Sequence, residues 1–541
     1  MSTFEVRKRD GLARIGLYKE GDLIIQTPTV IDTITQFPNL SKYCHTNIPL
    51  STDQSDICKY YVPGDGPIMF NPSIKCPAKS GDVIVVSGWK STLNDSKRYI
   101  EYLSALHTNT PPDTARYAPA SALPSNVSIL IATGFDIFDY TAVDLASIQG
   151  WFCRPEGKFD SSFLDKGVCG CEGCKTHNLQ LHNRIALLNE ISFVKTQIEM
   201  GQTRELIEQR CRLNPEHVSL IRRLDKTELE YNAIPTVRSS KFYSNSSESL
   251  TRPEISFFET RLIDRFVPSR TDICVLLPCS ARKPYSQSKT HQKFQTAIDN
   301  RAHEVIITSP LGVVPRELEH IYPASHYDVP VTGYWDREEL EIISNYISEY
   351  LSKHKYDRIL CHLNGGAKEA ACIAASKIGI NLEFTCTDDR PTSPTSLKNL
   401  SDKLEGYPKK SSNRIRGVIA WQFGELVDTT GWIIKGRYNN QKIYHKNIQL
   451  FSIDLSTGLL RPTIEGWKHI SKYKVHTKEG FVPQGDILVP GIDSIDPNIR
   501  EGDEVLIEGS GYVATGKAVM NTSEIQRSSR GLAIKVRKTK K

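Results

Sequence analysis

The chain has 541 residues, which is too long for one hydrophobic core and predicts three or four domains. Its apolar fraction of 39% suits globular packing, but no apolar run reaches the roughly 18 residues of a membrane span, so we expect no membrane partner. The net charge of +6 says little about partners, and the absence of an apolar core near the first residues argues against a secretory signal, which favours the cytoplasm.

Residues 1–245 mix strand-like apolar runs with helical segments, which favours an α/β arrangement. The strand-like runs are ARIGLY, DLIIQTPTVI, DVIVVSGW and VSILIATGFDIFDY. SKRYIEYLSAL predicts one helix, and the segment from HNRIALLNEI to RELIEQRCR predicts another, which Gly201 interrupts. The polar stretch that follows, RSSKFYSNSSESLTRPE, is typical of a linker.

Three cysteines, Cys169, Cys171 and Cys174, crowd into the sequence CGCEGC. Because the thirteen cysteines are an odd number and the protein is expected in the cytoplasm, this cluster indicates metal ligation rather than disulfides. Three thiolates and one imidazole make the closed tetrahedral set of a structural Zn²⁺ site. His182, at the start of a predicted helix, is the stronger candidate for the imidazole, and His177 is the weaker one. Four protein ligands leave no position for water, so we expect the zinc to be structural.

A second α/β segment covers residues 255–395. ICVLLP, EVIITSP and RILCHL predict buried strands, and REELEIISNYISEYLSKH predicts one of the helices between them. In a mostly parallel sheet, ligands gather at the loops that follow the carboxyl ends of the strands. The polar loops PCSARKPYSQSKTH, SPLGVVPRELE and HLNGGAKEAA follow these three strands, and we expect them to converge on one pocket.

The first of these loops concentrates reactive side chains. Cys279 is a candidate nucleophile, and Lys283 and His291 are candidate acids or bases. Helix capping or packing also explains each residue taken singly, so both interpretations stay open. The candidate orienting hydroxyls belong to Ser280, Tyr285, Ser286 and Ser288, and the candidate substrate-binding residues are Arg282, Pro310, Gly312, Arg316 and Glu317.

After a second hydrophilic break, the sequence predicts a small α+β domain at residues 410–470 and a strand-rich domain at residues 471–541. Short strands with closely spaced Gly, Pro and Asp predict a small β-barrel for the latter. Five of the last seven residues are basic, which fits either a solvated terminus or a nucleic-acid contact. The candidate RNA-binding residues are Lys535, Arg537, Lys538, Lys540 and Lys541.

Several motifs resemble those of tRNA-guanine transglycosylases, which are zinc-containing TIM-barrel enzymes. These motifs are FEVRKRDGLARIG, TPTV, GFDIFDY, and CGCEGC followed by LHN. The resemblance implies a degenerate TIM-barrel-like fold for residues 1–245, zinc on the three cysteines and His182, and a nucleophilic role for Asp139. The Pro-Thr-Arg sequence that follows the nucleophile in active transglycosylases is absent here, so a structural role for Asp139 stays open.

The chain as a whole is similar to the archaeosine synthase family, in particular its lysine-transferring alpha subunits. The similar motifs are PCSxxKPYSxSxxH, SPLGVVPRELE, YDVPVTGYWD and a carboxyl-terminal segment resembling the PUA RNA-binding domain. The resemblance implies that free lysine is added to the nitrile of 7-cyano-7-deazaguanine in the D-arm of tRNA. It also implies a radical S-adenosylmethionine partner subunit that cleaves the product. The sequence does not fix the oligomeric state, and a homo- or hetero-oligomer stays open.

Two mechanisms and two other functions stay open from the sequence. Cys279 attacks the nitrile first to form a thioimidate, or an oriented lysine amine adds directly. The alternative functions are a non-catalytic tRNA-binding scaffold and an active tRNA-guanine transglycosylase.

Overall fold

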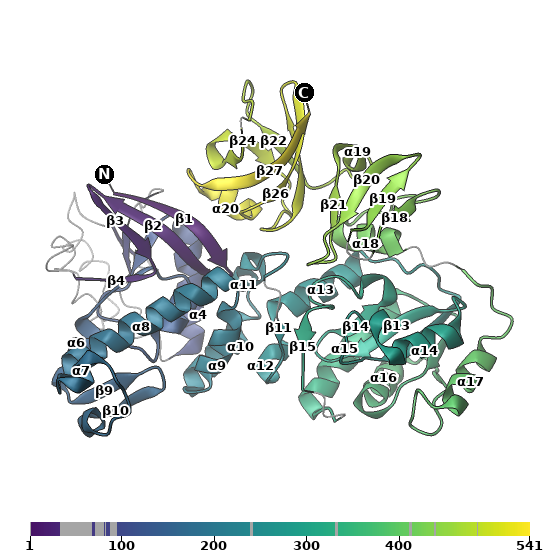
Figure 1. Ribbon diagram of the computed structural model, residues 1–541, viewed down its shortest axis with the longest axis horizontal. Coiled ribbons are helices and arrows are strands. Elements are labelled where there is room, and N and C mark those ends of the chain that lie inside the picture. The colour runs from purple at the N-terminus through teal and green to yellow at the C-terminus, as the bar shows by residue number, and fades with distance from the viewer. Residues whose placement is uncertain are drawn as a thin grey trace. The chain divides into compact units, whose positions relative to one another are not determined.

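The computed structural model describes residues 2–32, 68–70, 81, 83–86, 95–238, 242–330, 334–410, 414–437, 440–483 and 485–540 (Figure 1). It divides into two compact units, each of which is described by itself. Unit 1 comprises Met1–Ser239, His476–Asp503 and Lys517–Val536, and unit 2 comprises Ser240–Val475, Glu504–Gly516 and Arg537–Lys541. Among the described residues, no helix combines the length and the apolar character that crossing a bilayer requires.

Two sheets form the centre of unit 1. A parallel five-stranded sheet has the order β4-β8-β7-β6-β5, and an antiparallel sheet has the order β1-β2-β3. Phe4 and Tyr18 of the antiparallel sheet share one apolar cluster with Val85 and Tyr117 of the parallel sheet. The strands are β1 (Ser2–Asp10), β2 (Ala13–Glu20), β3 (Leu23–Thr27), β4 (Thr29–Ile31), β5 (Ile68–Phe70), β6 (Val83–Val86), β7 (Ala115–Tyr117) and β8 (Ile137–Asp139).

The helices of unit 1 confirm the predicted break at Gly201, which ends α8 with φ +68° and separates it from α9. One prediction is wrong: VSILIATGFDIFDY is not a single strand, because its first six residues form helix α5 before the chain turns into β8. A short, fully buried apolar run has no periodicity that distinguishes a helix from a strand. The helices are α4 (Ser96–Asn109), α5 (Val127–Ala132), α6 (Thr141–Ile148), α7 (Glu172–Lys175), α8 (Leu179–Met200), α9 (Thr203–Cys211), α10 (Pro215–Leu224) and α11 (Glu228–Ala233).

A five-stranded sheet with the order β14-β13-β12-β16-β17 organises unit 2. Its strands are parallel except β14, which returns antiparallel to β13. Alternate residues of β12, such as Val275 and Leu277, pack against Phe294 of α14 and Leu400 of α17. The elements are β12 (Ile273–Pro278), α14 (Lys289–Ile298), β13 (His303–Thr308), β14 (Gly312–Pro315), α15 (Arg337–Lys353), β16 (Arg358–Cys361), α16 (Gly365–Ile378), β17 (Glu383–Phe384) and α17 (Pro394–Lys403).

Both polar breaks of unit 2 contain structure that the sequence analysis did not predict. The supposed linker holds β11 (Phe242–Tyr243) and α12 (Ser247–Leu250), and β11 pairs in parallel with β15 (Tyr327–Asp328). The second break holds α17, whose Leu400 is buried against the sheet together with the neighbouring Leu404. Few apolar residues suffice to hold such short elements in place, and so the surrounding polar composition concealed them.

The remainder of unit 2 contains α13 (Pro253–Asp264), α18 (Arg414–Phe423), a four-stranded antiparallel sheet and α19 (Ile464–Trp467). The strands of this sheet are β18 (Ile433–Lys435), β19 (Lys442–His445), β20 (Ile448–Ile453) and β21 (Leu460–Pro462).

The carboxyl-terminal sheet has six strands in the order β23-β27-β26-β25-β22-β24. Its strands are β22 (Lys474–Thr477), β23 (Ile487–Leu488), β24 (Ile492–Ile495), β25 (Glu504–Gly509), β26 (Tyr512–Ala518) and β27 (Leu532–Lys540), with helix α20 (Thr522–Arg527) before the last strand. The basic tail up to Lys540 is thus the last part of strand β27, and its basic side chains are exposed.

Candidate functional site

A pocket of about 450 Å³ lies in unit 2 where the loops after β12, β13 and β16 meet. Cys279 comes from the first loop, Ser309 from the second, and Asn364 with Gly366 from the third. The convergence of three polar loops on one pocket is therefore confirmed. The other lining residues are Ser244, Asn245, Ser246, Ser247, Leu250, Pro278, Val329, Pro330, Tyr334, Trp335, Asp336, Glu339, Gly365 and Ala367.

Cys279 lies directly after β12, and its side chain is exposed where it lines the pocket. The ammonium group of Lys283 lies 3.7 Å from the centre of the Tyr327 ring, which is a cation–π contact. Burial lowers the pKa of Lys283 and makes its ammonium a better proton donor than a solvated lysine. An accessible thiol and a half-buried amine thus belong to the same loop.

A buried hydroxyl network supports this loop from beneath. The Tyr285 hydroxyl lies 2.6 Å from the Tyr327 hydroxyl, which also contacts the Thr308 hydroxyl. Burial raises the pKa of Tyr285 well above its ordinary value, so this phenol stays neutral. Ser288 caps α14 by accepting a hydrogen bond of 3.1 Å from the backbone N–H of His291. We infer that these hydroxyls hold the loop in place.

His291 is fully buried behind the loop. An Nη of Arg316 donates to His291 Nδ1 at 2.9 Å, which leaves the ring proton on Nε2. Burial, reinforced by the charge of Arg316, lowers the pKa of His291 to about 3. The imidazole is therefore neutral at physiological pH, and the geometry suits a positioning residue better than an acid.

Of the residues predicted in these two loops, Cys279 lines the pocket and the others do not. Ser280 donates to the Arg282 carbonyl oxygen at 3.1 Å, and the backbone N–H of Ser286 donates to Glu319 at 2.9 Å. Gly312 has φ +69°, and a Cβ there would lie 2.7 Å from the Tyr346 Cβ and 2.8 Å from the Tyr346 ring. Four predicted substrate-binding residues lie elsewhere in these loops: Arg316 pairs with Glu304 and Glu319, Glu317 pairs with His303 at 3.0 Å, and Arg282 and Pro310 lie outside the lining.

Sequence reasoning missed two carboxylates in the pocket lining, Asp336 and Glu339. Asp336 caps α15 by accepting a hydrogen bond of 2.8 Å from the Glu339 backbone N–H. Burial raises the pKa of the Glu339 carboxyl. The motif YDVPVTGYWD, which ends at Asp336, was the available signal, although its residues 331–333 lie outside the described part of the chain.

The amino-terminal end of α16 also lines the pocket. Asn364 occupies the N-cap position but makes no side-chain capping hydrogen bond, so the first N–H groups of this 14-residue helix have no side-chain acceptor from their cap. A Cβ on Gly366 would meet the Trp335 ring at 2.7 Å, which explains a glycine there. One wall of the pocket is thus suited to an anion and another, at the two carboxylates, to a cation.

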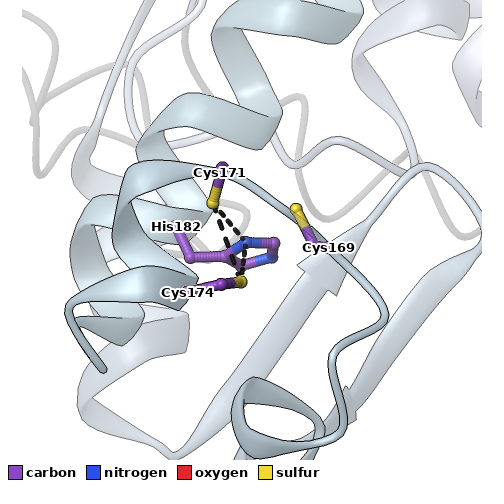
Figure 2. A group of neighbouring side chains, drawn as sticks. All are labelled: Cys169, Cys171, Cys174 and His182. Atoms are coloured by element: carbon purple, nitrogen blue, oxygen red, sulfur yellow. Dashed lines mark hydrogen bonds between the residues drawn. The ribbon is translucent and has the colours of Figure 1, made fainter.

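The cysteine cluster of unit 1 brings Cys169, Cys171, Cys174 and His182 together, as Figure 2 shows. Their ligand atoms all lie within 4.8 Å of one another. His182 Nδ1 lies 3.3 Å from the Cys171 sulfur and 3.4 Å from the Cys174 sulfur. His177, the weaker candidate, pairs instead with Asp165 at 2.7 Å.

These residues fit a tetrahedral metal ion. The Cys171 and Cys174 sulfurs are 3.7 Å apart, close to the separation of about 3.8 Å that Zn–S bonds of about 2.3 Å impose on a tetrahedron. His182 Nε2 lies 3.1 Å from the Cys153 carbonyl oxygen, so Nε2 carries the proton and Nδ1 is free to bind metal. Gly173 admits the close turn, since a Cβ there would lie 2.2 Å from the His182 backbone nitrogen. The four residues could therefore hold a metal ion as a Cys₃His set.

Asp139, at the end of β8, is buried and accepts three hydrogen bonds. The donors are the Tyr117 hydroxyl at 2.7 Å and the backbone N–H groups of Ala120 and Thr141 at 2.8 and 2.7 Å. Such a saturated carboxylate favours the structural alternative, although its nucleophilic role stays an untested prediction.

The basic residues of the tail divide into two groups. Arg537 pairs with Glu504 at 2.5 Å, and Lys540 lies 3.8 Å from Glu465. Lys535 and Lys538 are exposed on β27, and Lys541 lies outside the described residues. Lys535 and Lys538, which take no part in these two ion pairs, are therefore the better candidates for a contact with RNA phosphates.

Comparison with known proteins assigns two parts of the chain. The family described as a domain of unknown function, DUF5591, matches residues 255–404, and the PUA domain matches residues 478–539. The archaeosine synthase subunit alpha of Methanosarcina acetivorans is 35% identical over 86% of this chain and 80% of its own length. The archaeosine synthase of Haloferax volcanii is 31% identical over 99% of this chain and 98% of its own length. The tRNA-guanine(15) transglycosylase of Methanobrevibacter smithii is 25% identical over 82% of this chain and 70% of its own length.

Proposed function

This chain belongs to the archaeosine synthase family, and we propose on that basis that it transfers free lysine to 7-cyano-7-deazaguanine in tRNA. The observation that carries the proposal is the pocket at Cys279, which combines a thiol with two carboxylates and whose Cys279 loop also carries the amine of Lys283. Addition of an amine to a nitrile requires a group that donates a proton to the nitrile nitrogen and a site that orients the attacking amine.

The pocket suits an amino acid in its zwitterionic form. The carboxylates of Asp336 and Glu339 would hold the α-ammonium group of lysine, and the free N–H groups at the start of α16 would hold its α-carboxylate. In this arrangement the side-chain amine extends toward Cys279. A pocket of about 450 Å³ has room for lysine beside an extruded base.

The reaction is an addition and releases nothing. In the covalent route, the Cys279 thiolate bonds to the nitrile carbon and Lys283 gives a proton to the nitrile nitrogen, which forms a thioimidate. The lysine amine then bonds to the same carbon and the thiolate leaves, while a proton of the amine returns to Lys283. In the direct route, the amine bonds to the carbon without the thioimidate. Both routes end in an amidine that joins lysine to the base.

The other parts of the chain support binding of tRNA. We propose that the PUA domain binds tRNA and that unit 1 keeps a degenerate transglycosylase-like barrel stabilised by zinc on the Cys₃His site. The amidine product would pass to a radical S-adenosylmethionine subunit, because this sequence has no C-x-x-x-C-x-x-C motif of its own. We place these events in the cytoplasm, where tRNA is modified.

The test uses purified protein, cyano-modified tRNA and isotopically labelled lysine. Digestion and mass spectrometry of the nucleosides should find the modified base heavier by one complete lysine, because the addition expels no atom. Binding of tRNA without incorporation of lysine would instead support a scaffold. Release of guanine from unmodified tRNA would support a transglycosylase, the name that some relatives carry.

A further inference from the structure

Four arginines line a cavity of about 170 Å³ in unit 1. Arg9 comes from β1, Arg14 from β2, Arg116 from β7 and Arg527 from the end of α20. Among the described residues of the lining, Glu524 supplies the single carboxylate. Guanidinium groups this close together in a small cavity are stable when groups of opposite charge or hydrogen-bond acceptors balance their charges.

Three of the arginines have clear partners. Arg9 donates to Glu524 at 2.7 Å, and Arg14 forms a two-pronged pair with Asp136 at 2.9 and 2.6 Å. Arg527 donates to three carbonyl oxygens at the carboxyl end of α4 at 2.6 to 3.0 Å, where the helix dipole is negative. These contacts hold the walls of the cavity together.

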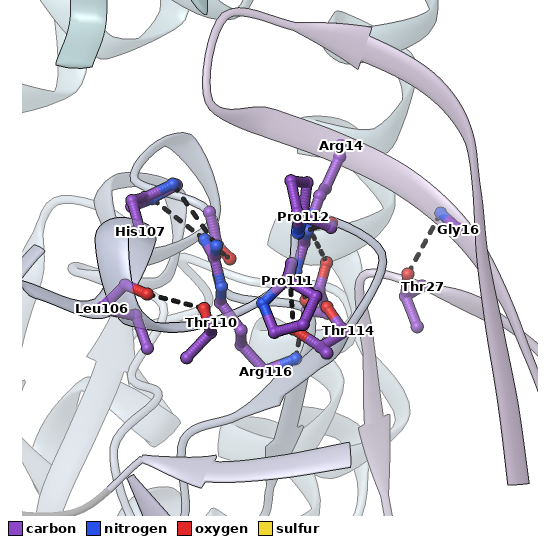
Figure 3. A network of polar contacts seen from close by, with 12 residues as sticks. Arg14, Gly16, Thr27, Leu106, His107, Thr110, Pro111, Pro112, Thr114 and Arg116 are labelled. Atoms are coloured by element: carbon purple, nitrogen blue, oxygen red, sulfur yellow. Dashed lines mark hydrogen bonds and ion pairs between the residues drawn. The ribbon is translucent and has the colours of Figure 1, made fainter. Parts of the chain in front are cut away.

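Arg116 is the exception. Its side chain is 1% exposed, and its guanidinium contacts the two ring nitrogens of His107 at 2.9 and 3.3 Å and the Gly134 carbonyl oxygen at 3.3 Å, as Figure 3 shows for the histidine. Its Nε has no hydrogen-bond partner among the described residues. Burial, together with the charge of Arg116, lowers the pKa of His107 well below its ordinary value. The ring is therefore neutral and does not balance the charge of the guanidinium.

The nearest carboxylate is already used. Asp136 accepts both bonds from Arg14, and it contacts Arg116 only through the backbone N–H, at 2.8 Å. A buried guanidinium without a hydrogen-bonded carboxylate is strongly disfavoured unless another anion pairs with it. We propose that this cavity binds a phosphate group, held by Arg116 with help from Arg527.

Phosphate fits the cavity better than a carboxylate would. Its charge of about −1.5 to −2 suits several arginines at once, and guanidinium groups match its oxygens in a forked geometry. Arg116 is the middle residue of β7 and Asp136 directly precedes β8, whereas Asp139 is the last residue of β8. The site is therefore separate from the end of the sheet where ligands usually bind. The phosphate comes from a nucleic acid or from a free phosphate compound.

The test is calorimetric titration of the whole protein with inorganic phosphate in a chloride buffer. We expect saturable binding that raises the unfolding temperature, and at least about tenfold weaker binding for Arg116→Met. The variant should also be at least as stable as the wild type without phosphate, because it removes an unpaired buried charge. No binding to the wild type, or equal binding to the variant, would overturn the proposal.

A second variant decides the matter even if Arg116→Met does not fold. Glu524→Gln keeps the capping contact with Asn521 but removes the negative charge from the lining, so phosphate should bind more tightly. Unchanged or weaker binding would contradict the proposal.

Competition with tRNA identifies where the bound phosphate group comes from. It comes from nucleic acid if tRNA displaces inorganic phosphate and if the binding of tRNA to Arg116→Met depends less steeply on salt. A free phosphate compound is the source if tRNA leaves phosphate binding unchanged.

Discussion

The metal cluster and the loop that carries Cys279 into the pocket both contain cysteine and histidine, but they are built in opposite ways. The cluster takes its four ligands from residues 169–182, and these side chains point at one another. The pocket takes its lining from separate loops between residues 244 and 367, and its thiol faces an open space. In the cluster His182 is a candidate ligand, whereas His291 is buried behind the pocket loop and supports it.

The difference separates the roles that a thiol takes in this protein. Thiolates that lie this close together are stable when a metal ion balances their charge. The cluster should therefore contribute to the free energy of unfolding. A single exposed thiol beside a lysine contributes little to stability and is available for chemistry. Substitutions in the two regions should accordingly divide between loss of stability and loss of activity.

The largest effect should come from Cys171→Ser in the cluster. Loss of one thiolate removes the metal, and the free energy of unfolding should fall by more than about 3 kcal/mol because metal binding is coupled to folding. Elemental analysis and thermal unfolding measure the two results. His177→Ala serves as the control, since that exposed ring pairs with Asp165 and should leave both unchanged. A stable, metal-free Cys171→Ser protein would show that the cluster is not a structural site.

Cys279→Ala should have the opposite profile. If the thioimidate forms, incorporation of lysine falls by more than about a thousandfold, while stability changes by less than about 0.5 kcal/mol because the side chain is exposed. Intact-protein mass spectrometry without lysine should find a covalent adduct that the variant lacks. Cys372→Ala, which removes a half-buried thiol of α16, is the control. Substantial activity in Cys279→Ala and no adduct would establish direct addition in place of the covalent route.

The lysine subsite gives a smaller and more selective effect. Glu339→Gln and Asp336→Asn should each raise the KM for lysine about tenfold with little change in kcat, because each removes a charge that holds the substrate. Asparagine still caps α15, so stability is retained. Glu338→Gln, next to Glu339 but outside the pocket lining, should leave KM unchanged. Equal effects of all three changes would rule out a specific subsite.

The contrast also explains how far the sequence predicted the molecule. The cysteine spacing was sufficient to predict which four side chains the structure brings together, because a local motif fixes its own geometry. The pocket loops were predicted from the order of strands in a parallel sheet, and Cys279 lies where that rule placed it. Ser244 and Ser246 line the same pocket but were assigned to a linker, since polar linings and polar linkers have the same composition. Arg116 carries no motif, and only its lack of a carboxylate partner in three dimensions identifies it.

The tail should affect tRNA binding without affecting either cysteine site. Lys535→Gln combined with Lys538→Gln should weaken tRNA binding about fivefold and make its salt dependence shallower by about one per lost phosphate contact. This pair is a cleaner test than truncation after residue 470, which would also remove the Thr515 hydroxyl that accepts a hydrogen bond from Trp467. Lys517→Gln is the control with the same change on β26. Unchanged affinity of the double variant would assign RNA recognition to other residues.

The smallest effect concerns the pH dependence of stability and tests whether His291 is only a support. Its pKa is held at about 3 in the folded protein by burial, against an ordinary value of 6.5. As the pH falls through 6.5 the unfolded chain takes up a proton that the folded chain does not, so stability declines by about 0.7 kcal/mol between pH 7 and pH 6. His291→Gln removes this titration from both states, and its stability in urea should decline less over that interval by the same amount. If stability depends on pH in the same way in the wild type and in His291→Gln, then His291 has the same pKa in the folded and unfolded states. In that case a protonated His291 could act as the acid.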